Sequence, residues 1–136
     1  MNNMMDEFWG KPISVYTRAQ ALADGVLVDL TETAKPFGFK IPLACTDTVW
    51  RSLDWPLGHK PGLGQSTAGR VHDALTMARL AANAAAHAGE STVDFDMLLV
   101  PVSGDAETPR VVKLRLAVSG GDSGEPVLTL MYPGEE

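Results

Sequence analysis

The sequence is poor in the features that mark several large protein classes. It holds a single cysteine, Cys45, which cannot form an internal disulfide and has no His or Cys neighbour at metal-binding spacing. No window approaches the roughly 20 apolar residues of a membrane span, and the first residues resemble no signal peptide. These absences favour a cytoplasmic protein with a buried core thiol and no membrane partner.

Basic residues are also few. The 11 Lys and Arg are outnumbered by 17 Asp and Glu, which gives a net charge of −6. General nucleic-acid binding needs a basic footprint, so direct binding of this kind is not expected. The acidic share is nevertheless ordinary for a globular protein, so the composition does not indicate wholesale mimicry of DNA.

The pattern of helix and strand signals predicts an α+β fold. We expect residues 1–12 to form a loose arm and residues 13–136 a single α+β domain, a normal length for one domain. The N-terminal half reads as short helices and strands. Thr17 and Gln20 form a capping-box pattern that starts a helix over residues 18–24, and Thr46 is placed to start a second short helix.

The C-terminal half predicts one long alanine-rich helix packed on a three-stranded antiparallel meander. Ser66 or Thr67 starts the helix, which ends at Gly89. The strands are expected over residues 93–102, 110–118 and 126–132. Their alternation gives inner layers of Met97/Leu116/Leu128 and Leu99/Leu114/Leu130. The outer face then carries Leu98, Val100, Lys113, Arg115, Thr129 and Met131.

One segment, Gly121-Asp-Ser-Gly-Glu-Pro126, is similar to the nucleophile signature of trypsin-like serine proteases. A serine nucleophile needs a histidine base and an orienting carboxylate, and His87 with Asp94 would give the right chain order. That family, however, needs two β-barrels and a long stretch of chain between base and nucleophile. We therefore interpret the segment as a glycine-rich hairpin turn, and we expect no catalytic residue.

The glycine-rich loop over residues 58–67 is the strongest candidate ligand site. It runs into the N-terminus of the long predicted helix, an arrangement that can bind an anion, although it lacks the lysine of a Walker A motif. The candidate ligand-binding residues are His59, Gly62, Gly64, Ser66 and Arg70.

No metal or cofactor is expected. His72 and His87 share one face of the long helix, but they are roughly 22 Å apart at a rise of about 1.5 Å per residue, too far to share an ion.

Two segments resemble a known family: the opening YTRAQALADGVLVDL over residues 16–30 and GDSGEPVLTLM over residues 121–131. The family consists of small proteins of unknown function encoded in proteobacterial genomes, plasmids and phages. The resemblance covers nearly the whole chain beyond the first dozen residues. It implies an accessory gene of mobile elements and brings no established activity.

These observations favour a non-enzymatic interaction protein of a phage or mobile element. Its expected role is anti-defence, as an anti-CRISPR-like or anti-restriction inhibitor of a host protein that handles nucleic acid. The outer sheet face and the acidic turn are the candidate partner surfaces, through Leu98, Val100, Lys113, Arg115, Met131, Asp122 and Glu125. Two alternatives stay open: a small enzyme or anionic-ligand-binding domain that uses the 58–67 loop, and a homodimeric regulator.

Overall fold

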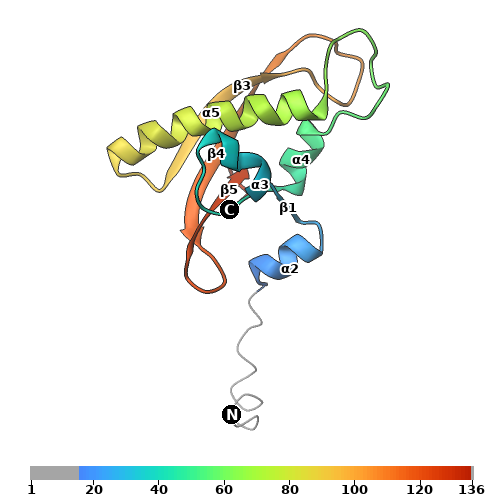
Figure 1. The fold of residues 1–136 in the computed structure, drawn as a ribbon. Helices are drawn as coiled ribbons and strands as arrows, with labels where there is room; N and C mark the ends of the chain where they lie inside the picture. The colour runs from blue at the N-terminus through green and yellow to red at the C-terminus, as the bar shows by residue number, and fades with distance from the viewer. Residues whose placement is uncertain (1–15, 136) are drawn as a thin grey trace.

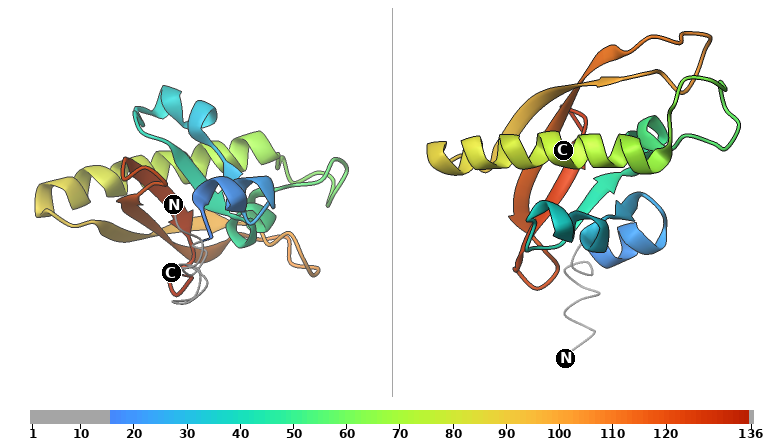
Figure 2. Two further views of the ribbon diagram at one scale, coloured as in Figure 1. Left: turned by 90° about the horizontal axis from the view of Figure 1, so that it is seen from below. Right: turned by 45° about the horizontal axis from the view of Figure 1, so that its top comes forward.

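A five-stranded mixed sheet with helices on both of its faces organises the structure, a computed structural model that describes residues 16–135 (Figure 2). The predicted loose arm over residues 1–12 lies outside this range. The elements in chain order are α2 (Arg18–Ala23), β1 (Leu27–Asp29), α3 (Thr31–Ala34), the 3₁₀ helix η1 (Lys35–Phe37), β2 (Leu43–Thr46), α4 (Asp47–Leu53), α5 (Thr67–Ala88), β3 (Thr92–Leu99), β4 (Arg110–Gly120) and β5 (Pro126–Met131). The prediction of an α+β fold is confirmed.

The sheet is larger than the predicted meander. Its strand order is β1-β2-β5-β4-β3, so β3, β4 and β5 do run antiparallel as consecutive neighbours. The description as a three-stranded antiparallel meander is wrong in detail, because β2 lies parallel to β5 and β1 pairs antiparallel with β2. Figure 1 shows the long strands β3 and β4 with α5 running across them. The β2–β5 pairing sets Leu43 opposite Leu128, two residues that no local pattern connects.

The strand register also differs from the prediction, by an even number of residues. Leu116 lies opposite Val93 and Leu130, rather than opposite Met97 and Leu128. Because side chains alternate with a period of two, an even shift leaves every residue on its predicted face. The inner-face leucines are accordingly buried as expected, and the error comes from misplacing the centres of the two hairpin loops.

Local capping explains where the helices begin. The Thr17 hydroxyl accepts from the Gln20 amide, and the Gln20 side chain accepts from the Thr17 amide at 2.8 Å, so the predicted capping box is present. Thr46 caps α4 and Ser66 caps α5 in the same way. Gly89 ends α5 with φ of +71°, a left-handed conformation that costs glycine little.

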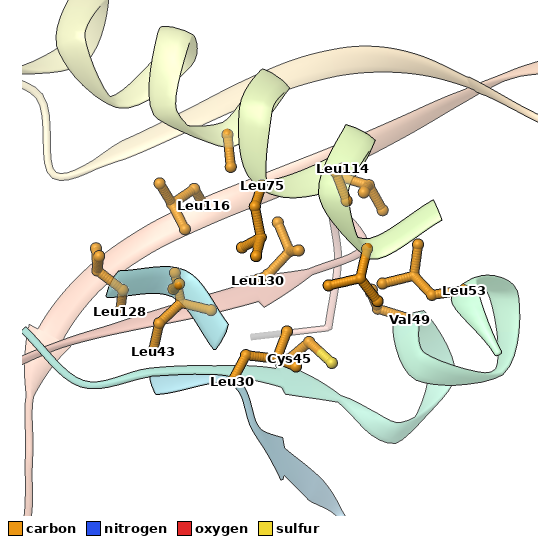
Figure 3. Close-up of a cluster of buried hydrophobic side chains, with 14 of the residues drawn as sticks. Leu30, Leu43, Cys45, Val49, Leu53, Leu75, Leu114, Leu116, Leu128 and Leu130 are labelled. Atoms are coloured by element: carbon orange, nitrogen blue, oxygen red, sulfur yellow. The ribbon is translucent and has the colours of Figure 1, made fainter. Parts of the chain in front are cut away.

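Helix α5 lies across one face of the sheet and closes the core. Its buried residues Val71, Ala74, Leu75 and Ala78 lie one helical turn or less apart and form a single stripe. Figure 3 shows Leu75 pointing between leucines of β4 and β5, with the side chains of α4 and β2 completing the cluster. Small alanines beside Leu75 allow the helix to approach the strands closely. Within residues 16–135 no helix is both long enough and apolar enough to cross a membrane.

Helix α2 lies against the opposite, outer face of the sheet at β5. The Arg18 guanidinium donates to the Thr129 hydroxyl at 2.8 Å and to the Leu128 carbonyl at 2.7 Å. Ala21 of the same helix is buried. The N-terminal elements of the described chain therefore cover part of the outer face, while no element within residues 16–135 covers Leu98 and Val111 on the β3–β4 part.

Candidate functional site

The open part of the outer face carries three of the predicted partner-binding residues. Leu98 and Lys113 are exposed, and Arg115 is partly so. Two ion pairs cross the strands beside them: Lys113 bonds to Asp96 at 3.0 Å, and Arg115 bonds to Asp94 at 2.6 Å. The Arg115 guanidinium holds the pKa of Asp94 below its ordinary value. These pairs fix the two strands and leave little net charge on the surface between them.

The predictions for Val100 and Met131 are corrected, because both are buried, at 5% and 8% exposure. Val100 follows the last residue of β3, where the chain turns inward and its carbonyl accepts from Arg70 at 2.9 Å. Met131 lies on β5, on the part of the outer face where Val127 is also buried. The alternation gave the correct face for Met131 but could not show that this part of the face is covered.

An exposed apolar pair completes the open surface. Leu98 of β3 and Val111 of β4 are direct cross-strand partners, and their exposures are 61% and 68%. Val111 was missed as a site residue, although it alternates with Lys113 and Arg115 and so shares their face. We call the set Asp96, Leu98, Val111 and Lys113 the hairpin surface.

The acidic turn has a structural task that the sequence did not reveal. The Asp122 carboxylate accepts from the backbone amides of Arg18 and Ala19, at 2.8 and 3.0 Å, and so caps α2 from a distance. The Glu125 carboxylate accepts from the Ser123 amide within its own turn. Gly124 has φ of +82°, which explains a glycine in the protease-like segment as a turn requirement.

The glycine-rich loop is bound to the neighbouring hairpin loop. His59 donates through Nε2 to the Val102 carbonyl at 2.6 Å and stacks edge-on against Trp55. Lys60 donates to the Pro101 and Ala106 carbonyls. A hollow of about 320 Å³ lies within the loop. His59 is therefore engaged in an internal bond.

Gly62, Gly64 and Ser66 line that hollow together with His59, so the structure brings four of the five predicted ligand-binding residues to it. Ser66 caps α5 by accepting from the Gly69 amide, and Gly62 and Gly64 take positive φ angles of 88° and 67° in the loop itself. Arg70 does not line the hollow: its guanidinium bonds to Gln65 of the loop and to carbonyls at the end of α4 and just after β3. Arg70 thus contacts the loop through Gln65 without lining the predicted site.

Arg70 is the one buried charged residue recorded among residues 16–135, with 3% exposure. Its guanidinium donates to the carbonyls of Leu53, Ser52 and Val100 and to the Gln65 side chain, and it lies 4.8 Å from the Trp55 ring centroid. Burial lowers the pKa of Arg70. All these acceptors are neutral, so the positive charge is held without a hydrogen-bonded carboxylate.

Arg70 also lines the most voluminous hollow recorded in this part of the chain. We call this hollow of about 660 Å³ the arginine cleft. Its lining residues are Thr48, Arg51, Ser52, Arg70, Leu99, Val100, Pro101, Val102, Ser103, Arg110, Val112 and Tyr132. Three arginines and no carboxylate are among them. No local pattern predicts this cleft, because α4, α5 and the β3–β4 hairpin bring its residues together only in the folded state.

The remaining chemistry-bearing residues lie apart. Ser123 is in the exposed turn, whereas the His87 ring bonds through Nδ1 to the Asn83 carbonyl of its own helix. Cys45 is fully buried in β2, and burial raises its pKa to about 12. Over the described part of the chain, no three His, Cys, Asp or Glu side chains gather closely enough to hold a metal ion.

Comparison with known proteins gives one match. The whole chain, residues 1–136, matches the model of a family described as "Family of unknown function (DUF6573)". No curated protein is significantly similar to the chain, and neither is any solved structure.

Proposed function

The chain belongs to this family of unknown function, and we propose that it is a non-enzymatic protein-binding protein of a phage or other mobile element. Its proposed task is to inhibit a host defence system, in the manner of an anti-CRISPR or anti-restriction protein. It would act sterically, by covering a surface that a host protein needs. Its residence in the cytoplasm is part of the same proposal.

The observation that carries the proposal is the hairpin surface. Leu98 and Val111 lie directly opposite each other on an open sheet face, and both are more than half exposed. Paired exposed apolar side chains with a charged rim are typical of protein-binding sites. Here Asp96 and Lys113 form the rim, and the ion pairs of β3 and β4 hold the strands in place. The surface is therefore pre-organised for a partner.

The charges nearby favour a basic partner. A groove of about 340 Å³ runs between α5 and β3, and Asp73 lines it together with Met77, Met97, Leu98 and Asp96, of which Asp96 is paired with Lys113. Strand β3 is also the edge of the described sheet. The net charge of −6 would attract a protein that handles nucleic acid and speed the encounter. The proposed occupant is therefore a basic host protein that contacts Leu98, Val111 and the acidic groove.

The experiment compares phage plating on bacteria that carry a restriction or CRISPR system, with and without the expressed chain. We expect the wild-type chain to raise plating efficiency and Leu98→Asp to abolish that effect. The matched control is Leu80→Asp, because Leu80 on α5 is 60% exposed and so nearly equal to Leu98. A captured host protein should bind Leu98→Asp at least about tenfold more weakly than it binds the wild-type chain or Leu80→Asp. Equal behaviour of the two variants, or no effect on any defence system tested, contradicts the proposal.

The two alternatives are tested separately. A homodimeric regulator would elute in gel filtration with light scattering at twice the mass of 14.5 kDa. If Leu98→Asp converts such a dimer to a monomer, the hairpin surface binds a second copy rather than a host protein. The alternative of an anionic-ligand site in the 58–67 loop stays a separate proposal, in which the hollow lined by His59, Gly62, Gly64 and Ser66 would hold the ligand.

A further inference from the structure

The arginine cleft is built to hold a negative charge. We propose that it binds a small organic anion, a carboxylate or phosphate ester that carries an apolar group. The charge balance supports this proposal, since the lining holds three arginines and no Asp or Glu, although acidic residues outnumber basic ones in the chain as a whole. This inference is independent of the proposed protein-binding role, which rests on the opposite face of the same hairpin.

The buried Arg70 guanidinium supplies a fixed positive charge on the cleft wall. Its bonds to the carbonyls of Ser52, Leu53 and Val100 hold it rigidly, but those acceptors are neutral. A charge removed from water without a counter-charge is costly. An anion that enters the cleft would offset part of that cost, so Arg70 makes the cleft attractive to a ligand before any direct contact forms.

Arg110 supplies the direct contact. It begins β4 on the cleft side of the sheet, it is exposed, and its guanidinium forms no recorded hydrogen bond or ion pair within residues 16–135. A guanidinium presents two parallel N–H groups that match a carboxylate or phosphate. Arg51, by contrast, is already paired with Asp47 at 2.9 Å. Arg110 is therefore the residue that would bind the anionic group.

The apolar side chains that line the rest of the cleft indicate that the ligand carries an apolar group beside its anionic one. Leu99, Val100, Pro101 and Val102 line one stretch of it, and Val112 lies on the adjacent strand. A hydroxyl pair, Ser52 Oγ and Tyr132 Oη, forms a short hydrogen bond on the wall. A volume of about 660 Å³ is within the range of small-molecule sites, which are mainly apolar with a few polar groups.

A second carboxylate beside the cleft, besides the Asp47 that pairs with Arg51, is engaged elsewhere. Glu135 accepts from the Thr46 and Thr48 hydroxyls, at 3.0 and 2.7 Å, and from the Tyr132 amide at 2.7 Å. It is thus held at the start of α4 and does not bond to an arginine of the cleft. Within residues 16–135, Arg70 and Arg110 are therefore recorded without a bonded carboxylate, whereas Arg51 is paired with Asp47.

The test is calorimetric titration of the full chain with hexanoate, hexyl phosphate and inorganic phosphate. We expect hexanoate or hexyl phosphate to bind, inorganic phosphate to bind at least tenfold more weakly, and Arg110→Gln to weaken binding at least tenfold. Lys40→Gln is the matched control, because it removes one exposed positive charge that lies outside the cleft. Both variants are first checked for an unchanged melting temperature.

If Arg110→Gln does not fold, a second variant still tests whether the cleft binds an anion. Ser103→Glu places a carboxylate at the exposed rim of the cleft and should abolish binding through repulsion. The proposal is overturned if none of the three anions binds at millimolar concentration, or if folded Arg110→Gln and Lys40→Gln bind equally. It is also overturned if inorganic phosphate binds as tightly as hexyl phosphate, since the apolar walls would then contribute nothing.

Discussion

Truncation of Arg70 should destabilise the protein more than any other arginine substitution. Arg70→Ala leaves the carbonyls of Ser52, Leu53 and Val100 without their donor. A buried polar group without a partner costs about 1–3 kcal/mol. Three such groups give about 3 kcal/mol even at the low end, and loss of the contact with the Trp55 ring adds about 0.5–1 kcal/mol. Relief of the buried charge and entry of water from the cleft offset part of this sum, so we expect a net loss of about 3 kcal/mol.

The assay is urea unfolding followed by tryptophan fluorescence. With a slope of about 1.5 kcal/mol/M, a loss of 3 kcal/mol lowers the midpoint by about 2 M. Arg70→Lys keeps the charge but lacks the fork of five donors, so its midpoint should lie between those of the alanine variant and the wild type. Arg51→Ala is the control, because its exposed pair with Asp47 contributes no more than about 0.5 kcal/mol. A loss below about 1 kcal/mol for Arg70→Ala, or equal losses for both arginines, would refute the reasoning.

Three further predictions concern groups whose roles the structure defines. Asp122→Ala should lower the free energy of unfolding by about 1 kcal/mol, because the carboxylate caps α2 through two amides; an unchanged urea midpoint would contradict this. The pKa of Asp94 is held below 3.8 by Arg115, so the stabilisation from this pair is complete above pH 3.8 and is lost as the pH falls through the lower folded value. The stability difference between the wild type and Asp94→Asn should therefore shrink in acid; a difference that grows below pH 3.8 would exclude the pair as its source. Cys45, buried and with a pKa of about 12, should react with a thiol reagent at pH 8 only after urea unfolds the chain, and rapid labelling of the native protein would disprove its burial.

Local signals in the sequence were sufficient for the helices and for the two faces of the strands. Thr17, Thr46 and Ser66 act as caps because their hydroxyls reach amides three residues ahead, which is a purely local geometry. The alternation along β4 likewise placed Leu114 and Leu116 in the core whatever the register. These features depend on the spacing of residues that are close together in the chain, and so they could be predicted from the sequence.

Features that join distant segments were not predictable in this way. The sequence contains no local record that β2 pairs with β5, and without that pairing the sheet was taken to have three strands. The same limitation affected the site. Arg70 was assigned to the adjacent loop, where it does bond to Gln65, but its other donors reach residues 17, 18 and 30 positions away along the chain. The arginine cleft and the capping role of Asp122 were missed for the same reason.

The position of β5 also determines when the sheet can assemble. This last strand of the described chain lies at the middle of the sheet, between β2 and β4. Strands β1 and β2 can therefore join β3 and β4 only after synthesis has passed Met131, the last residue of β5. Contacts of such long sequence separation slow folding, and a nascent chain that lacks β5 exposes the unpaired edges of β2 and β4. We expect chains shortened before Pro126 to aggregate rather than to fold, even though every helix described within residues 16–135 is present in them.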